Sequence, residues 1–313
     1  MIPGRKTLSQ HLVEFKRQWE LQLMVLPWIF YIFIFAYIPM YGLIMAFQEY
    51  ELGDIIGFSR WVGLFHFKMF IKTPELLQIL RNTFVISILK ISVGLSCAIL
   101  LALIINEVRS KLFKRVVQTI SYLPHFISWV IVAGLVFDFL SVSGTLNEIL
   151  ISLGMIDEPI VFMGESRYFW FIVVLSDLWK ELGWNSIMFI AAIAGIDQQL
   201  YESAEIDGAG RARKMWHITL AGIKPTIVIV LIMMLGQVLN AGFEQNLLLT
   251  NNLANTLVSD VSEIIHTYVY KVGLSYGRFS YATAVGICKS LVNVTLLVIA
   301  NATSKKLTQV SLW

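Results

Sequence analysis

Two lysines stand out in this sequence because long runs of apolar residues surround each of them. Lys90 lies in NTFVISILKISVGLSCAILLALII, and Lys289 lies in SYATAVGICKSLVNVTLLVIA. An ammonium group near the centre of a membrane helix costs about 2.5–3.5 kcal/mol on insertion scales. Each lysine therefore holds an acidic solute such as a uronate, or it reaches the interface or pairs with Asp138, Asp177 or Glu181. We favour the second interpretation, and the first stays open.

Amides, a carboxylate and aromatic rings also lie within or beside the apolar runs. Gln237, Asn240 and Glu244 are three and four residues apart, which places them on one face of a helix. Because lipid offers such groups no hydrogen bonds, we expect them to line a solute pathway or to contact a second membrane subunit. Polyhydroxylated solutes are held by polar groups and flat aromatic faces, although Trp is also a common interface anchor. The further pathway candidates are Trp129, Trp179, Trp184, Asn185 and Tyr281.

The composition is that of a membrane protein. The 313 residues are 57% hydrophobic and only 14% charged, with a mean hydropathy of +0.71. Soluble domains average about 45–50% apolar and about 25% charged residues. A bilayer core of about 30 Å needs roughly 20 apolar residues in a helix, and six runs meet this requirement. We predict an all-α membrane protein with six transmembrane helices at about 22–48, 82–106, 117–140, 168–195, 223–246 and 280–302.

The basic residues predict that both chain ends face the cytoplasm. Fourteen Lys and Arg fall in the segments on the side of the termini, and seven fall in the segments on the other side. The positive-inside rule then places the N-terminal segment 1–21, the loop 196–225 and the tail 303–313 in the cytoplasm. The first outer loop is mildly discordant, because it holds four of those seven residues.

Motifs for chemistry within the chain are missing. No G-x-x-x-x-G-K-[ST] occurs, and GAGRARK in the 196–225 loop lacks the Lys-Ser/Thr end that a phosphate-binding loop needs. The five His show no zinc-ligand spacing, and there is no nucleophile motif or convincing carboxylate pair. Net charge is only +3, with no concentrated basic patch. We therefore expect no catalytic residue, no metal site, no cofactor in this chain and no nucleic-acid partner.

The loop 196–225 contains a helix–turn–helix signal, LYESAEIDGAGRARKMWHITLAGIKPT, over residues 200–226. Asp207-Gly208 is a turn signal between two stretches with helical propensity, and Pro225 lies near the start of the next apolar run. Such a hairpin either docks into a cleft on a soluble partner or rests on the membrane surface. The residues by themselves leave both alternatives open.

This hairpin resembles the EAA loop of permease subunits in ATP-driven, binding-protein-dependent importers. The family pattern is roughly E-A-A-x-x-D-G-A, an aromatic spacer, I-x-L-P and a further Pro. The matching residues are Glu202, Ala204, Asp207, Gly208, Ala209, Trp216, Ile218, Leu220 and Pro225. Ser203 replaces the first family Ala, and Ala221 replaces the first Pro. The resemblance implies that this loop, Ser203 included, receives mechanical work from a separate ATPase.

The likeness extends over most of the chain. Segments such as FKRVVQTISYLPHFISWVIVAGLVF and LNAGFEQNLLL resemble the lipoprotein-type polysaccharide permeases, to which an alginate importer's first permease subunit is also similar. The resemblance implies a bacterial cytoplasmic-membrane heterodimer with a second permease. It also implies two ATPase subunits that bind ATP and Mg, and an extracellular solute-binding protein. The cargo implied is an oligosaccharide, with an acidic one as an open option, imported by alternating access.

Two rival functions remain at this stage. The first is a secondary transporter driven by an ion gradient, in which Lys90, Lys289 and Glu244 form a proton relay. The second is an importer permease of the same mechanism for a solute other than sugar, such as a peptide or phosphate. The hairpin alone permits this second rival, and only the whole-chain resemblance favours sugar. A membrane enzyme is a more distant alternative, because no suitable carboxylate pair is present.

Overall fold

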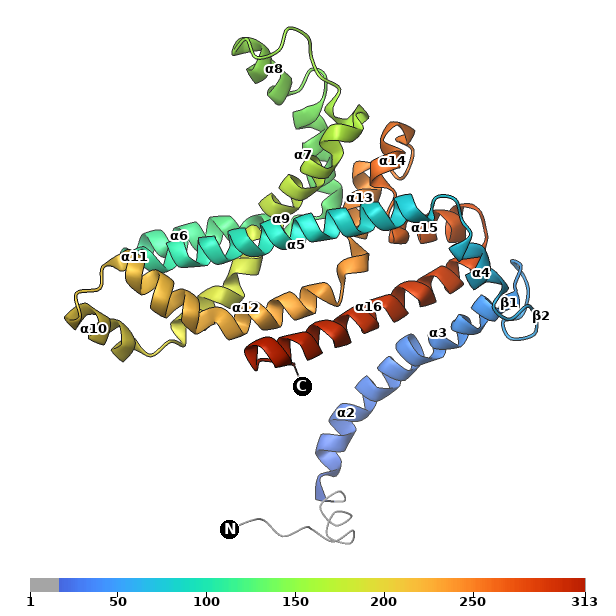
Figure 1. The fold of residues 1–313 in the computed structure, drawn as a ribbon. Coiled ribbons are helices and arrows are strands. Elements are labelled where there is room, and N and C mark those ends of the chain that lie inside the picture. The colour runs from blue at the N-terminus through green and yellow to red at the C-terminus, as the bar shows by residue number, and fades with distance from the viewer. Residues whose placement is uncertain (1–16, 313) are drawn as a thin grey trace.

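The computed structural model describes residues 17–312. Of the predicted N-terminal segment 1–21, residues 1–16 lie outside this range. Within it the chain is helical apart from two short strands. Long helices run beside one another in an elongated body, the N-terminal helix extends away from this body, and a smaller helical projection rises on the other side (Figure 1).

The first apolar run forms one continuous helical rod. It comprises α2 (Trp19–Ile32), a π-helical turn η1 (Phe33–Tyr37), α3 (Ile38–Met40) and the 3₁₀ segment η2 (Tyr41–Phe47). No side chain of α2 is buried, although it is almost entirely apolar. A helix that is hydrophobic all round needs lipid or another protein around it.

A short outer segment follows this rod. The strand β1 (Gln48–Glu49) pairs antiparallel with β2 (Arg60–Trp61), and α4 (Phe65–Ile71) comes next. Phe70 of α4 is buried against the end of the helical body, whereas Trp61 is exposed.

Two long helices form the centre of the body. The helix α5 (Leu76–Glu107) encloses the predicted run 82–106, and α9 (Ser166–Ala194) covers the run 168–195. They pack along each other, and α6 (Lys111–Tyr122) lies against α9. Gly183 of α9 contacts the backbone of Ser121, where a Cβ would collide with the carbonyl group. This glycine therefore sets the close approach of the two helices.

The predicted run 117–140 is divided between two helices. The chain leaves α6 at Tyr122, passes through the 3₁₀ turn η3 (Leu123–Phe126) and becomes extended at Ile127. Pro124 has no N–H to donate within a helix, which explains the interruption. The next helix, α7 (Trp129–Leu140), begins where the Ser128 hydroxyl accepts a hydrogen bond from the Ile131 N–H. Residues 117–122 therefore belong to α6, which has one polar and one apolar face.

A break also divides the predicted run 223–246. Its helix, α12 (Leu220–Leu235), continues from α11 (Arg211–Lys214) through the π-helical turn η5 (Met215–Thr219). The chain then forms the 3₁₀ turn η6 (Val238–Asn240) and α13 (Phe243–Leu249). Ala241 and Gly242, with φ of 47° and 72°, break the helix between these two elements.

The remaining elements complete the body and its projection. The helix α8 (Thr145–Ser152) and the turn η4 (Phe162–Gly164) lie between α7 and α9. Between α13 and the last helix lie η7 (Thr256–Val258), α14 (Ser259–Ser262), α15 (Ile265–Tyr270) and η8 (Lys271–Ser275). The helix α16 (Phe279–Thr308) encloses the predicted run 280–302.

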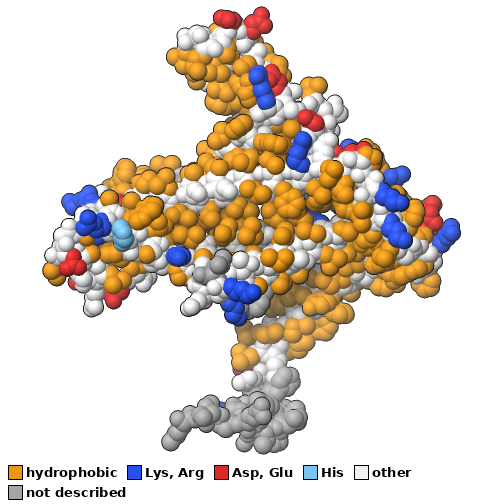
Figure 2. All heavy atoms as spheres, in the orientation of Figure 1, with side chains coloured by type: hydrophobic (Ala, Val, Ile, Leu, Met, Phe, Trp, Pro, Cys, Tyr) orange, Lys and Arg blue, Asp and Glu red, His pale blue; other side chains and the backbone are white. Residues whose placement is uncertain are grey.

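Five helical segments of the described chain are long and apolar enough to cross a membrane. They are Trp19–Phe47, Leu76–Glu107, Trp129–Ser152, Arg211–Leu235 and Phe279–Lys306. The predicted run 168–195 is absent from this set because α9 contains Asp177, Lys180 and Glu181. Hydrophobic side chains cover the middle of the body, while charged side chains gather mainly at its two ends (Figure 2). This banded surface is the one that a bilayer requires.

Candidate transport site

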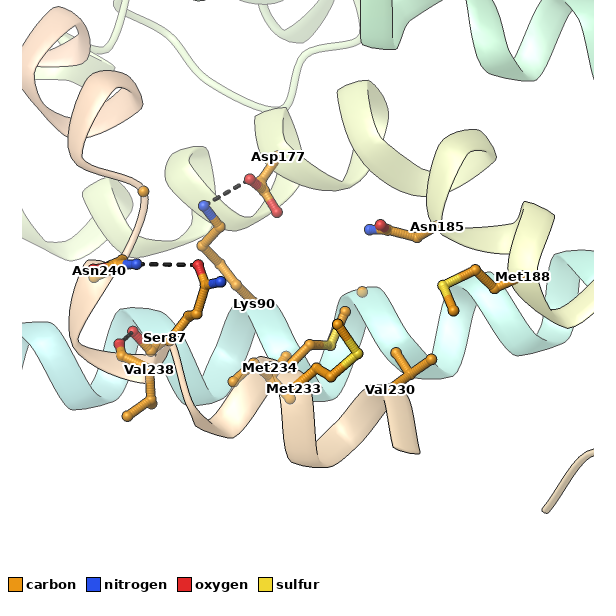
Figure 3. A pocket seen from close by; sticks show the side chains of 15 residues that line it. Ser87, Lys90, Asp177, Asn185, Met188, Val230, Met233, Met234, Val238 and Asn240 are labelled. Carbon is orange, nitrogen blue, oxygen red and sulfur yellow. Dashed lines mark hydrogen bonds and ion pairs between the residues drawn. The ribbon is translucent and has the colours of Figure 1, made fainter. Parts of the chain in front are cut away.

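A cavity of about 380 Å³ opens between α5, α9, α12 and the broken segment 236–242. Four of the residues predicted for the solute pathway line it: Lys90, Asn185, Gln237 and Asn240. Figure 3 shows Asn185 and Met188 projecting from α9 towards the methionines of α12. One part of the cavity therefore offers charged and amide groups, and the other offers thioethers.

Lys90 forms an ion pair inside this cavity. Its Nζ lies 2.6 Å from Oδ1 of Asp177, and the two side chains are only 15% and 18% exposed. Asp177 is therefore the carboxylate, of the three candidates in the sequence, that meets Lys90. The Nζ also donates a hydrogen bond to Oε1 of Gln245 at 2.9 Å. A paired and hydrogen-bonded lysine avoids most of the penalty that an isolated cation would have in an apolar helix.

Gln245 is a site residue that sequence reasoning missed. It is 1% exposed, and its Nε2 donates to the Val173 carbonyl at 2.7 Å and to the Ser176 hydroxyl at 2.8 Å. Its amide thus joins α13 to α9 as well as to Lys90. The available signal was the run of three polar residues, Glu244, Gln245 and Asn246, between apolar neighbours.

Gln237 and Asn240 lie together at the open side of the cavity. The Asn240 Nδ2 donates to Oε1 of Gln237 at 3.2 Å (Figure 3). The segment is held to α5 because the Ser87 hydroxyl donates to the Val238 carbonyl. The predicted single helical face is wrong for Glu244, which is exposed and does not line the cavity, because the helix is broken at Ala241 and Gly242.

Trp129 and Trp184 surround a separate polar cluster outside the cavity lining. The Trp184 ring stacks on His125 with 4.2 Å between centroids, and His125 Nδ1 lies 2.7 Å from Oε2 of Glu181. Lys180 donates to the His125 carbonyl at 2.5 Å and lies 5.5 Å from the Trp129 ring centroid. These contacts account for the charges of Lys180 and Glu181 without any solute.

Three further predicted pathway residues also lie elsewhere. Trp179 is 49% exposed and does not line the cavity. Tyr281 is buried, and its hydroxyl lies 2.8 Å from the Thr73 hydroxyl and 3.0 Å from that of Tyr268. Lys289 lies on α16, where its Nζ is 3.1 Å from Nδ1 of His266.

The loop 196–225 forms the expected helix–turn–helix. The helix α10 (Gln198–Ile206) begins where the Asp197 carboxylate accepts a hydrogen bond from the Gln199 N–H at 3.0 Å. It ends at Ile206, and Gly208 follows with a φ of 74°, the left-handed conformation that glycine adopts readily. The Ala209 N–H then bonds the Ala204 carbonyl at 2.8 Å.

Contacts within this hairpin hold its two arms together, and several of its residues are open to the surroundings. The Tyr201 and Thr219 hydroxyls lie 2.9 Å apart, and Lys214 pairs with Glu205. The hydrogen bond and the charge of Lys214 lower the pKa of Glu205 below its ordinary value. Ala204 and Ala209 are half-buried. The predicted coupling residues that are exposed are Glu202, Ser203, Asp207, Gly208, Trp216 and Pro225.

The family "Binding-protein-dependent transport system inner membrane component" matches residues 93–309, which include most of the cavity and the whole hairpin. The chain belongs to this permease family. Membership confirms the expectation of a transport subunit rather than an enzyme. It also disfavours the ion-gradient rival, because the family serves binding-protein-dependent systems.

Two proteins of Bacillus subtilis (strain 168) are similar to this permease along nearly their full lengths. Protein LplB is 42% identical over 301 residues, which cover 95% of this chain and 92% of LplB. The polygalacturonan/rhamnogalacturonan transport system permease protein YteP is 46% identical over 298 residues, which cover 94% of this chain and 90% of YteP. The predicted resemblance to polysaccharide permeases is therefore confirmed.

Solved structures of an importer share the fold of this permease. One is a bacterial ABC transporter involved in the import of the acidic polysaccharide alginate. Its matching chain has a TM-score of 0.87 and 40% identity, over 96% of this permease and 99% of that chain. A second structure shows a bacterial alginate ABC transporter in complex with an alginate pentasaccharide-bound periplasmic protein, with a TM-score of 0.86.

Proposed function

We propose that this permease passes an oligosaccharide, delivered by an extracellular binding protein, through the cavity between α5, α9 and α12. The observation that carries the proposal is this cavity, lined by amides and an ion pair, in a chain of the transport-permease family. Its volume of about 380 Å³ lies within the usual range of small-molecule sites. Relatives that handle polygalacturonan and alginate support a carbohydrate cargo.

The proposal includes six membrane spans, with α9 as the fourth. Although α9 contains three charged residues near its middle, these charges find partners inside the protein. Asp177 meets Lys90, and Glu181 meets both His125 and Lys180. Internal pairing lets a helix with charged residues cross a bilayer. Composition alone therefore underestimates the ability of α9 to span the membrane. Six spans place both chain ends and the 196–225 loop in the cytoplasm of a bacterial cell, with the cytoplasmic membrane as the location.

A separate ATPase pair is the proposed partner of the hairpin. The exposed carboxylate of Glu202 and the exposed ring of Trp216 supply polar and apolar contacts on one compact element. The element is held rigidly by the Tyr201–Thr219 and Lys214–Glu205 contacts. Rigid elements transmit a displacement better than mobile loops, because they move as one body. ATP and Mg would be held by the ATPase subunits.

A second permease is the proposed partner on the open side of the cavity. Gln237 and Met233 line the cavity and are nevertheless exposed. The whole length of α2 is exposed as well. A second subunit on this side would close the pathway and allow alternating access between the two faces of the membrane.

Reconstitution tests this proposal. The permease is assembled with the second permease, the ATPase and the binding protein in proteoliposomes, and uptake of a labelled oligosaccharide is measured with and without ATP. We expect uptake to require ATP, and Asn240→Leu to reduce it while the ATPase stays in the complex. Uptake that persists without ATP as long as an ion gradient is present would refute the proposal.

A further inference from the structure

The lysines of the helical body differ in how their charges are balanced. Lys90 pairs with Asp177 at 2.6 Å, Lys180 with Glu181 at 3.3 Å, and Lys271 lies 2.9 Å from a Glu263 oxygen. Within residues 17–312, no carboxylate forms such an ion pair with Lys289. Lys289 is half-buried in the middle of an apolar helix, so the chain itself leaves this charge unneutralised.

The surroundings of Lys289 come from three different elements. Its Nζ on α16 donates to Nδ1 of His266 on α15, at 3.1 Å. The His266 ring packs against Phe243 of α13, with 4.7 Å between centroids, and Phe243 lies 5.7 Å from the Tyr270 ring. A histidine ring that accepts a hydrogen bond is neutral, so His266 does not balance the positive charge of Lys289. An ammonium has three donors, so two remain for a further partner.

One member of this cluster adjoins the proposed transport cavity along the chain, although none of its residues lines that cavity. Phe243 directly follows Gly242, which lines the cavity. Lys289 lies about 15 Å along α16 from Phe279, at the helical rise of about 1.5 Å per residue. In the proposed topology the Phe279 end of α16 faces the outside. An incoming solute would therefore meet Lys289 from the outer side of the membrane.

The chemistry of the cluster matches one kind of ligand. A free ammonium binds a carboxylate through charge-assisted hydrogen bonds, and an adjacent aromatic ring packs against the apolar face of a sugar ring. The cavity itself does not select for charge, because Lys90 and Asp177 cancel each other. The unbalanced positive charge of Lys289 is therefore the feature that would favour an acidic sugar over a neutral one.

We propose that Lys289, His266 and Phe243 form a subsite that binds the carboxylate of a uronate in the cargo. The proposal rests on the proposed function, and it narrows the cargo to acidic oligosaccharides. Lys289 acts as the specificity-determining cation, and His266 orients the ammonium group. The aromatic face of Phe243 packs against the sugar ring.

The experiment compares two cargoes that differ only in charge. Uptake of an oligogalacturonate and of the same oligosaccharide after reduction of its carboxyl groups is measured in proteoliposomes of the full importer. We expect Lys289→Gln to raise the KM for the acidic sugar by about tenfold, the size expected for one lost charge-assisted hydrogen bond. The KM for the reduced sugar should stay unchanged, and Lys289→Arg should restore most of the acidic uptake.

A matched control removes a positive charge from the same helix at a distance. Lys306 is exposed near the end of α16, and Lys306→Gln should leave both KM values unchanged. Equal losses for both sugars in Lys289→Gln would mean a structural role, and no loss for either sugar would mean no role. Both results overturn the subsite.

The same experiment can also reveal two other ligands of Lys289. An effect of Lys289→Gln that disappears when phosphatidylglycerol is replaced by phosphatidylcholine would identify a lipid phosphate as the ligand. Loss of the second permease from the purified complex would identify a carboxylate of that subunit. Either result overturns the proposal. Failure of the wild-type importer to take up either sugar would instead refute the proposed function.

Discussion

The ammonium group of Lys90 lies directly against the backbone of Gly242, in the space where any other residue would place its side chain. A Cβ at position 242 would lie only 2.5 Å from Nζ of Lys90. The same glycine has a φ of 72°, in the left-handed region. One residue thus combines two requirements, because the helix is broken there in a left-handed conformation and the ion pair occupies the adjacent space.

Gly242→Ala should therefore destabilise the permease for two reasons. The left-handed conformation costs a non-glycine residue about 1–2 kcal/mol, and the added methyl group displaces Lys90 from its contacts with Asp177 and Gln245. We expect a lower melting temperature of the purified complex and reduced uptake. Gly134→Ala on α7 is the matched control, because its Cβ would meet no atom within 4 Å. A Gly242→Ala variant as stable as Gly134→Ala would contradict the packing described above.

The Lys90–Asp177 pair should behave as a unit in a double-mutant cycle. Removal of one partner leaves an uncompensated buried charge, which costs about 3–5 kcal/mol. We expect Lys90→Met and Asp177→Asn each to lower the melting temperature strongly. The double variant should recover part of this loss, since neither charge then remains. Additive losses, within about 0.5 kcal/mol, would show that the two residues are not coupled.

His266 predicts a particular dependence of stability on pH. Burial, and secondly the charge of Lys289, lower the pKa of His266 from 6.5 to about 4. It lies in α15, outside the proposed membrane spans. The unfolded chain then binds this proton from pH 6.5 downward and the folded chain does not, so the free energy of unfolding falls as the pH drops from 6.5 towards about 4. Thermal unfolding across this range measures the effect.

The variant His266→Gln supplies the comparison for this titration, because it keeps a polar side chain without the titrating ring. Its stability should fall less steeply over the same pH range. Lys289→Gln should raise the pKa of His266, since it removes the second cause of the shift. Identical pH profiles for wild type and His266→Gln would show that another group titrates.

The hairpin predicts variants that separate ATP hydrolysis from transport. Glu202 is exposed on α10, and Gly208 follows that helix in the left-handed conformation. A proline cannot adopt the φ of Gly208, so Gly208→Pro should distort the turn. We expect Glu202→Ala and Gly208→Pro to lower uptake more than ATP turnover, with normal insertion into the membrane. Normal transport in both variants would rule out the coupling role.

Uninterrupted apolar runs predict their helices well. The helices α5 and α16 enclose the predicted runs 82–106 and 280–302, because a single lysine is the only charged residue in each run. The turn signal Asp207-Gly208 likewise predicts the end of α10, since glycine takes the left-handed conformation at little cost.

Runs with internal breakers are harder to interpret. A hydropathy pattern does not distinguish a kinked helix from two helices, and Pro124 and Gly242 both divide their runs. Because the break at Gly242 is not visible in the hydropathy pattern, helical spacing assigns Glu244 to the site, whereas Gln245 is the residue that contacts Lys90. Helical spacing counted from Asn240 holds only while the helix continues, and the left-handed residues Ala241 and Gly242 interrupt it immediately afterwards.

The balanced pair in the cavity bears on the electrical work of each import cycle. Lys90 and Asp177 together carry no net charge, so movement of the pair as one unit during the cycle transfers no charge through the membrane field. Each ionised group of an acidic cargo costs about 2.3 kcal/mol per 100 mV when it enters an inside-negative cell. For an acidic oligosaccharide, the energy that the ATPase must supply therefore grows with the number of uronate units carried.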